Sequence, residues 1–346
     1  MIKYPAAINH ISELGFHWET QDPFLFCAFH QDHYPPGNQN LGPNEALLAG
    51  RISGNDFNKK EGFRMYHGQQ VPGFPGHPHA GFETITLVEK GYVDHSDSLG
   101  AKGRFGFGDV QWMTAGKGIL HSEMFPLVNQ KEDNPLLLFQ IWLNLPRASK
   151  EVKPHFKMYW NELIPREEIM SSNGKKTSIK IIAGQLCQTK ALAPTPDSFA
   201  SKEENQVNIW RISMEEGAEF QFPESSLASH RNLYFFEGNK IEINGKEISS
   251  GHQIELDAQE KTKLVCTAEA AEFLFLEAKP INEPVVQRGP FVASSPEAMN
   301  EVIRHYQETE FGGWPFATYE QVHPVAARRF AQHSGGKIEH PPTPLT

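Results

Sequence analysis

The chain has 346 residues, 39% of them apolar and 21% charged, which is long enough for two medium domains with well-filled cores. Its net charge of −10 argues against a nucleic-acid binder that works through a large basic face. No apolar run is long enough to span a bilayer, and three scattered cysteines are a poor disulfide framework. These features predict a soluble, cytoplasmic protein with neither membrane nor direct nucleic-acid contacts.

Short strands separated by turns follow one another along most of the chain. Stretches rich in Val, Ile, Phe, Tyr and Thr alternate with Gly, Pro or Asn-Gly, which is typical of an all-β sandwich or barrel. The clearest stretches are FETITLVEKGYVDH, LLLFQIWLNLP, TSIKIIAGQL, NLYFFEGNKIEINGKEI and AEFLFLEAK. Within the fourth of these, Asn244-Gly245 predicts a tight hairpin.

Two other segments lack this strand pattern. Residues 35–62 are rich in turn-forming residues and predict a long loop, and around residues 143–168 Pro and charge rise in a way that indicates a boundary. We therefore expect two β-barrels of similar size that are joined by a linker and followed by a tail. In order, these segments are residues 1–147, 148–176, 177–313 and 314–346.

One helix is expected near the end of the second barrel, over residues 294–313. Ser294 or Ser295 can cap its first turn, Pro296 suits the first helical position, and Gly312-Gly313 can end it. Its apolar residues fall on one stripe, so the helix should pack against a barrel. The tail that follows is expected to cover a surface or to fray.

The first candidate site is the sequence HPHAGFET at residues 77–84. In an extended chain residues two apart point the same way, so His77, His79 and Glu83 would share a face with Ile85 and Leu87. That face changes from polar to apolar, as the wall of a barrel with a site at one end would. Two histidines in a loop are more often a surface feature than a ligand pair, so this stretch alone does not establish a metal site.

A second cluster follows in GDVQWMTAGKGILHSEMFP, residues 108–126, where a glycine-rich turn leads into His121 and Glu123. These two also share a face if the segment is extended. Three imidazoles and one carboxylate suit Fe(II), Mn, Ni, Cu or Zn, and four ligands on an octahedral ion leave two positions open. Spacing alone leaves open whether the carboxylate is Glu83 or Glu123. We expect the nearby DHSDS, residues 94–98, to be a hairpin turn in which His95 is no ligand.

The sequences HPHAGFETITLVEKG, DSLG and GDVQWMTAGKGILHSE resemble the signature of the pirin family of the cupin superfamily. EPVVQRGPFVASSPEAMNEVIRHYQETEFG resembles the C-terminal strand and helix of that family, so the similarity extends over roughly residues 20–312. The resemblance implies a bicupin, two antiparallel β-barrels with one metal site in the N-terminal barrel. It carries the ligands over to His77, His79, His121 and Glu123, and leaves Glu83 to support a ligand or to act as an acid or base in the pocket.

The chain departs from the family pattern in two places. The stretch between residues 34 and 77 is longer than usual, and the tail after residue 313 is extended. The longer stretch can be read as a lid over the site or as an added surface loop.

The resemblance implies two functions that share the same ligands. The first is a quercetin 2,3-dioxygenase-like oxidoreductase that uses O2 and one divalent metal to open the ring of a flavonol-like substrate, with Fe(II) expected first and Mn, Ni, Cu or Zn as alternatives. The metal would act as a Lewis acid, and Glu123 or Glu83 would take the hydroxyl proton. The second is a non-enzymatic, metal- or redox-sensing regulator that binds a transcription factor or a metabolic enzyme. The acidic charge suits such a protein partner.

Overall fold

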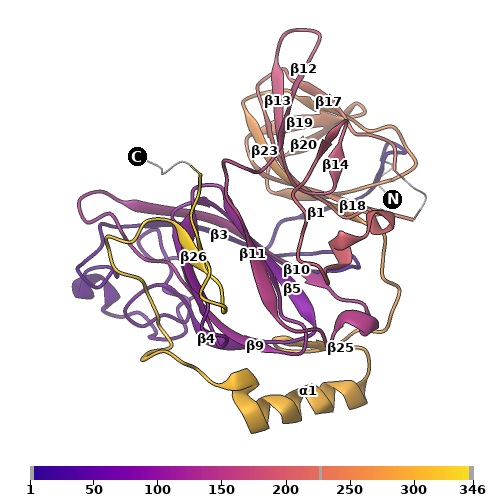
Figure 1. The fold of residues 1–346 in the computed structure, drawn as a ribbon. Helices are drawn as coiled ribbons and strands as arrows, with labels where there is room; N and C mark the ends of the chain where they lie inside the picture. Colours follow the sequence, from indigo (N-terminus) through magenta and orange to yellow (C-terminus); the bar gives the residue numbers. More distant parts are fainter. Residues whose placement is uncertain (1–3, 226–227, 343–346) are drawn as a thin grey trace. The chain divides into compact units, whose positions relative to one another are not determined.

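The computed structural model describes residues 4–225 and 228–342, and the chain forms two compact units (Figure 1). The site unit comprises residues 29–162 and 283–346, and the second unit comprises residues 1–28 and 163–282. The sequence predicts contiguous domains, whereas these units interleave along the chain. The N-terminal segment groups with the second half of the chain, and the helix and tail group with the first half.

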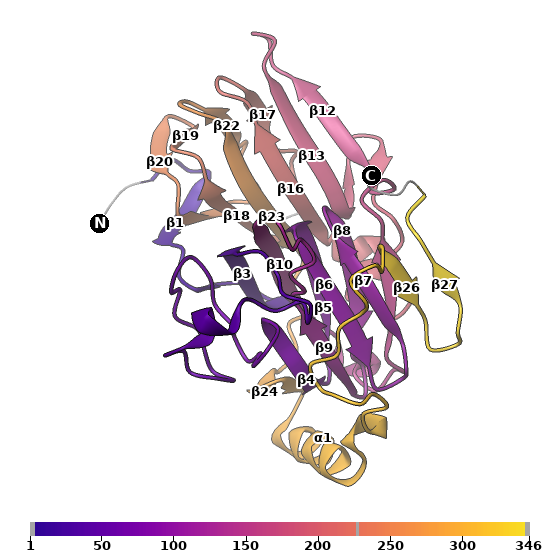
Figure 2. The same cartoon turned by 90° about the vertical axis from the view of Figure 1, so that its left-hand side faces the viewer.

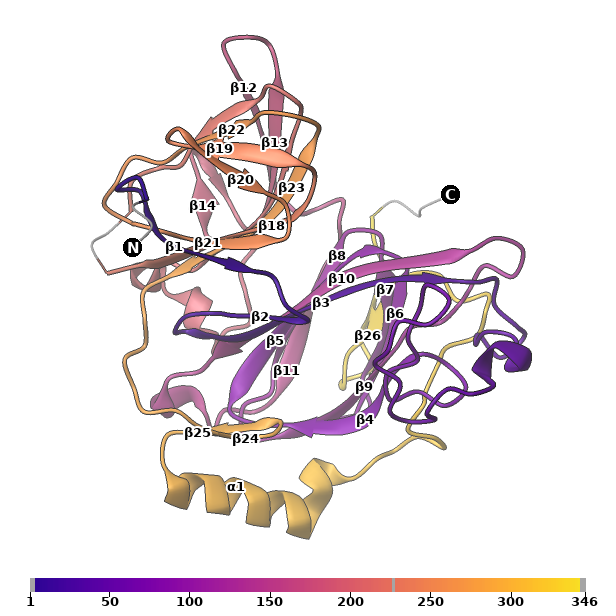
Figure 3. The same ribbon diagram turned by 180° about the vertical axis from the view of Figure 1, so that it is seen from behind.

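The site unit is built from two antiparallel sheets that face one another (Figure 3). The first sheet has the order β11 (His155–Tyr159), β8 (Asp109–Thr114), β5 (Phe82–Lys90), β10 (Asn134–Asn144) and β3 (Phe24–Tyr34), and the short β2 (His17–Trp18) pairs with the start of β3. The second has the order β27 (Ile338–Glu339), β26 (Phe330–Gln332), β7 (Lys102–Gly106), β6 (Tyr92–Asp97), β9 (Ile119–Met124) and β4 (Gly73–His79). The core between them includes Val88 and Leu138 from the first sheet and Val93 and Phe105 from the second.

The second unit also has two antiparallel sheets. The larger has the order β1 (Ile8–Glu13), β21 (His252–Leu256), β18 (His230–Glu237), β23 (Ala271–Ala278), β16 (Asn208–Met214), β13 (Lys176–Ala183) and β12 (Arg166–Met170). The smaller has the order β17 (Glu219–Gln221), β22 (Lys263–Cys266), β19 (Lys240–Ile243) and β20 (Lys246–Ser249). The predicted hairpin joins β19 to β20, and both Asn244 and Gly245 have the positive φ that such a turn needs.

The remaining elements are short. They are β2 (His17–Trp18), η1 (Glu45–Leu48), η2 (Arg147–Ser149), β14 (Gln185–Leu186), β15 (Thr189–Lys190), η3 (Phe199–Ser201), η4 (Glu203–Asn205), β24 (Val286–Arg288), β25 (Phe291–Ala293) and η5 (Glu310–Gly312). The all-β prediction is thus confirmed, with α1 (Pro296–Thr309) as the one α-helix of the described residues. None of the helices in those residues is long and apolar enough to cross a membrane.

The expected linker over residues 148–176 contains two strands. Phe156 and Tyr159 of β11 are buried, and the strand pairs with β8. Strand β12 is the edge of the larger sheet of the second unit and pairs with β13 alone, so its sequence REEIM can be largely charged. Both strands are sheet edges, and the prolines at positions 154 and 165 lie directly before them.

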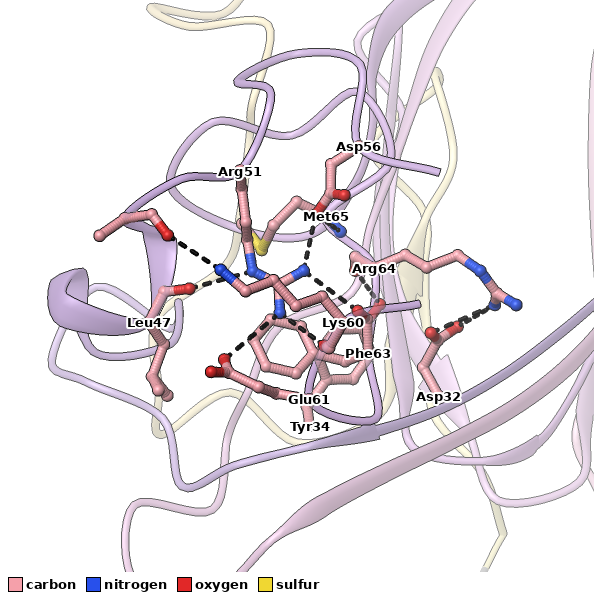
Figure 4. A network of polar contacts seen from close by, with 11 residues as sticks. Asp32, Tyr34, Leu47, Arg51, Asp56, Lys60, Glu61, Phe63, Arg64 and Met65 are labelled. Atoms are coloured by element: carbon pink, nitrogen blue, oxygen red, sulfur yellow. Dashed lines mark hydrogen bonds and ion pairs between the residues drawn. The ribbon is translucent and has the colours of Figure 1, made fainter. Parts of the chain in front are cut away.

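The long loop predicted for residues 35–62 is ordered around one arginine (Figure 4). The Arg51 guanidinium donates to Asp56 Oδ2 at 2.7 Å and to the carbonyl oxygens of Lys60 at 2.7 Å and Phe63 at 3.1 Å. Its Cζ atom lies 3.8 Å from the centre of the Phe63 ring. Apart from η1 and isolated bridges, this segment forms no β-sheet hydrogen bonds. The Arg51 guanidinium therefore donates to backbone carbonyls that a neighbouring strand would otherwise satisfy.

The predicted helix starts as expected but ends earlier. The Ser295 hydroxyl accepts from the Ala298 N–H at 3.2 Å, and α1 ends where Glu310 takes up the left-handed conformation, two residues before the predicted glycines. The helix packs against Phe291 of β25 and Leu120 of β9.

The tail covers the site unit instead of fraying (Figure 2). Strand β26 extends the sheet beyond β7. Buried Arg104 of β7 makes a two-point ion pair with Asp94 and donates to the backbone carbonyls of His323, Pro324 and Ala327 in the tail. The tail is therefore part of the folded unit.

Candidate metal centre

Strands β4 and β9 bring the three predicted histidines together. The two strands pair so that His77 lies directly opposite His121, and His79 follows on the same side of β4. One ligand atom from each ring lies within 4.8 Å of the others. The sequence predicted this grouping from two separate clusters, and the register between β4 and β9 provides it.

The ring nitrogens of this cluster are available to a metal. His77 uses Nδ1 to donate to the Pro75 carbonyl at 2.9 Å, which leaves its Nε2 facing His79 Nε2 at 3.1 Å. His121 is fully buried, and neither of its ring nitrogens has a hydrogen-bond partner among the residues that the structure describes. Buried polar atoms are nearly always satisfied, so this cluster fits a bound ion better than it fits a packed core.

Burial also sets the charge of the three rings. It lowers the pKa of His77 to about 4 and holds the pKa values of His79 and His121 well below the usual value for histidine. The imidazoles are therefore neutral at pH 7, which is the form that coordinates a transition metal.

Glu123 lies next to the histidine cluster, and two side chains of the facing sheet hold its carboxylate by hydrogen bonds. Its carboxylate accepts from Thr86 Oγ1 at 3.0 Å and from Gln140 Nε2 at 2.5 Å, and its Oε2 lies 3.8 Å from His121 Nε2. Burial raises the pKa of Glu123, while nearby His95 and the two hydrogen bonds oppose that shift. Glu123 is the carboxylate placed to join the histidines, and its role as fourth ligand stays a prediction.

Aromatic side chains form one wall beside the histidines. The His79 ring centre lies 5.0 Å from that of Phe82 and 5.2 Å from that of Trp142, and these two aromatic rings lie 4.3 Å apart. Phe82 is fully buried, whereas Trp142 is only partly buried. The signal for Trp142 was its place two residues after Gln140 in an otherwise apolar strand, since both then share a face.

Glu83 does not reach the histidines. Its Oε1 accepts from Trp112 Nε1 at 3.1 Å and from Thr114 Oγ1 at 2.8 Å, both on β8. Side chains of β5 alternate between the two faces of the sheet, and Phe82 and Thr84 lie on the face that is turned toward the histidines. Glu83 therefore lies on the opposite face, together with Ile85 and Leu87. The expected shared face is therefore wrong, and the structure does not place Glu83 to transfer a proton in the site.

A sheet-to-sheet corner explains this error. The chain leaves β4 in one sheet after His79 and enters β5 in the facing sheet at Phe82, so alternation does not continue across the corner. Gly81 forms the corner with φ +85°, and a Cβ atom there would come 1.9 Å from the Val292 carbonyl oxygen.

His95 lies closer to the site than the sequence indicated. It belongs to strand β6, not to a turn, and it pairs in register with Glu123. The fully buried ring lies 5.6 Å from that of His121, centre to centre, and its Nε2 is 3.2 Å from Asp97 Oδ2. The ligand cluster found in the described residues contains the other three histidines and not His95.

Comparisons with known protein families find two matching domains in this chain. The family described as Pirin matches residues 14–143, and the family described as Pirin C-terminal cupin domain matches residues 209–312. A Pseudomonas aeruginosa protein named "Putative quercetin 2,3-dioxygenase" is 32% identical over 70% of this chain and 80% of its own length. Pirin-1 of Arabidopsis thaliana is 35% identical over 69% of this chain and 78% of its own length.

A solved structure shows the same fold. The crystal structure titled quercetin 2,3-dioxygenase from Acinetobacter baumannii superposes with a TM-score of 0.67, covers 89% of this chain and 96% of its own, and is 23% identical. The two-domain cupin fold predicted from the sequence is therefore confirmed.

Proposed function

Because the chain belongs to the pirin family of cupins, we propose that it is a metal-dependent dioxygenase that opens the ring of a flavonol such as quercetin with O2. The observation that carries the proposal is the buried cluster of neutral histidines, with unpartnered ring nitrogens, beside an aromatic wall. The names of two Pseudomonas aeruginosa relatives, 32% and 33% identical, support the reaction class.

His77, His79, His121 and Glu123 would hold one divalent transition metal. Mixed imidazole and carboxylate sets suit Fe(II), which is our first choice, and also Mn, Ni, Cu or Zn. When bound, the ion supplies Lewis acidity toward the substrate hydroxyl oxygen and an open position for chemistry with O2.

Glu123 is the group that we assign to accept the proton of the substrate hydroxyl. The hydrogen bonds from Thr86 and Gln140 fix its carboxylate next to His121, so the acceptor oxygen is positioned before substrate binds. Trp142, whose ring is backed by the fully buried ring of Phe82, would contact the flavonol rings and exclude water from the reacting atoms.

Oxygen consumption tests the proposal directly. The full chain is purified without oxygen, loaded with Fe(II), Mn, Ni, Cu or Zn in turn, and mixed with quercetin in an oxygen electrode. We expect oxygen uptake with at least one metal and its loss in His79→Ala, while Glu83→Gln, which changes a carboxylate on the opposite face of the sheet, retains activity. An absence of turnover with every metal would refute the dioxygenase.

A further inference from the structure

We propose that a segment of the tail, residues 314–320, positions the metal ligand His77 through the peptide group between Pro75 and Gly76. We call this segment the tail strap. It belongs to the site unit, as the histidine cluster does. The inference rests on the metal site of the proposed function but not on the reaction that we propose for that site.

Strand β4 is irregular directly before its histidines. It pairs with β9 up to Phe74 and again from His77, and the register shifts between these two residues. In the described ladder, Pro75 and Gly76 have no partner on β9. β4 is also the last strand of its sheet, so this peptide group is open to a partner from outside the sheet. Bulges of this kind re-aim side chains and are frequent beside active sites.

The tail strap supplies a partner for this peptide group. The Gly76 N–H donates to the Tyr319 carbonyl at 3.0 Å. The Pro75 carbonyl belongs to the same peptide group and accepts from His77 Nδ1 at 2.9 Å. Because a peptide group is planar, a bond that fixes its N–H also fixes the direction of its carbonyl. Hydrogen bonds in such a chain polarise one another, and a carbonyl that accepts from one ring nitrogen orients the other toward a metal.

Gly76 allows the strap to come this close to β4. A Cβ atom at this position would lie 2.3 Å from Cδ1 of the Tyr319 ring, so a larger residue would displace the strap or the strand. The Tyr319 ring stacks with that of Trp314, with 5.5 Å between the ring centres and 16° between the planes. Trp314 Nε1 donates to the Thr318 carbonyl at 2.8 Å. The strap is therefore held together by its own contacts.

Glu320 anchors the strap to the long segment before β4. Its carboxylate accepts from the backbone N–H groups of Gln69 at 2.6 Å, Gln70 at 3.1 Å and Val71 at 3.4 Å. Consecutive N–H groups that converge in this way form a concave site for an anion. The two segments in which the chain is longer than the family pattern thus meet at this carboxylate, next to the ligand strand.

The loss of bound metal to a chelator tests the role of the strap. The full chain is loaded with zinc, and the rate of zinc transfer to an excess of chelator is measured. The double variant Tyr319→Ala, Glu320→Ala removes two side chains that hold the strap in place. We expect it to lose zinc about tenfold faster, as for other groups that orient a metal ligand. Glu339→Ala, which removes a tail carboxylate 3.1 Å from His333, is the matched control and should lose zinc at the unmodified rate.

The His77 ring gives a second readout that a general loss of stability would not move. In NMR spectra of the zinc-loaded chain, the resonance of its Nδ1–H reports on the hydrogen bond to the Pro75 carbonyl. We expect this resonance to move upfield in the double variant, because the acceptor is no longer held, and to stay in place in Glu339→Ala.

Either an unchanged rate of zinc loss or an unmoved His77 resonance in the double variant would overturn the inference, even if the chain consumes oxygen with quercetin. Faster zinc loss together with a moved resonance, in a chain that shows no turnover with any metal, would refute the dioxygenase and support the strap. A chain that takes up no metal would overturn both proposals.

Discussion

The two units of the chain use similar pairs of sheets to bury different polar groups. In the site unit the inward groups are neutral imidazoles beside a carboxylate that the facing sheet holds with Thr86 and Gln140. In the second unit the corresponding groups are a desolvated ion pair, Arg231 and Glu277. The first arrangement leaves ring nitrogens free for a cation, whereas the second neutralises itself. The same architecture therefore places polar groups between its sheets in both units, and the residue types decide whether those groups are left open or pair with each other.

The largest expected effect is the loss of metal from the site unit. In His121→Ala, a ligand with no competing hydrogen bond disappears, so metal measured by elemental analysis should fall from about one ion per chain to near zero. His252→Ala in the second unit is the control, because the hydrogen bonds of the His252 ring in the described structure go to Ser249 and Ser250 and not to a ligand residue. Full retention of metal in His121→Ala would show that the histidine cluster of the site unit is not the metal site.

The second unit should instead lose stability when its ion pair is broken. Arg231→Met leaves Glu277 buried beside an apolar chain, which should lower the free energy of unfolding by about 3 kcal/mol. Urea unfolding followed by circular dichroism measures this change. Glu203→Gln, which removes an exposed partner of Lys190, should have little effect on the same curve. Equal stability of both variants would contradict a structural role for the pair.

A smaller effect, on metal affinity, is expected from the hydrogen bond that joins the two sheets of the site unit at Glu123. Gln140→Leu removes the donor that holds Glu123 Oε2, and loss of a group that orients a ligand typically weakens metal affinity about 10-fold to 100-fold. Competition with a chelator measures the change. Gln111→Leu, on the same face of neighbouring β8 but without a hydrogen bond to Glu123 in the described residues, serves as the control. An unchanged affinity in Gln140→Leu would mean that Glu123 is not a ligand.

The smallest effect concerns a buried cation without a close carboxylate. Lys150 donates to the carbonyl of Gly81 at 2.8 Å and to Asn144 Oδ1 at 2.6 Å, and burial lowers its pKa to about 8 from an ordinary value of 10.5. Between these pH values the unfolded chain binds more protons than the folded chain, so stability should rise with pH, by at most roughly 1.4 kcal/mol per pH unit. Urea midpoints at pH 7.5 and 9.5 measure this slope, which Lys150→Met should abolish. A slope that persists in the variant would assign it to other groups.

The sequence was most informative where local pattern and pairing agree. The two ligand segments, the Asn244-Gly245 hairpin and the start of the helix follow from residue spacing and turn chemistry. The position of Glu83 could not be obtained this way, because alternation breaks at the Gly81 corner between two sheets.

Site residues that come from distant parts of the chain could not be predicted from the sequence either. Gln140 and Trp142 come to the histidines from the facing sheet, and His95 comes from the neighbouring strand β6. No spacing within either ligand segment encodes these approaches, since they depend on which strands pair and which sheets face each other.

The way in which Arg104 holds the tail has a consequence for aggregation. Without the tail, one side of β7 would become an unpaired sheet edge, and Arg104 and Asp94 would lose the carbonyl and N–H of His323 as hydrogen-bond partners. Open edges of this kind recruit strands from other molecules, whereas the tail ends the sheet in β27, an edge of only two residues. Removal of the tail by a protease that cuts after Gly313 should therefore expose the edge of β7 and promote aggregation.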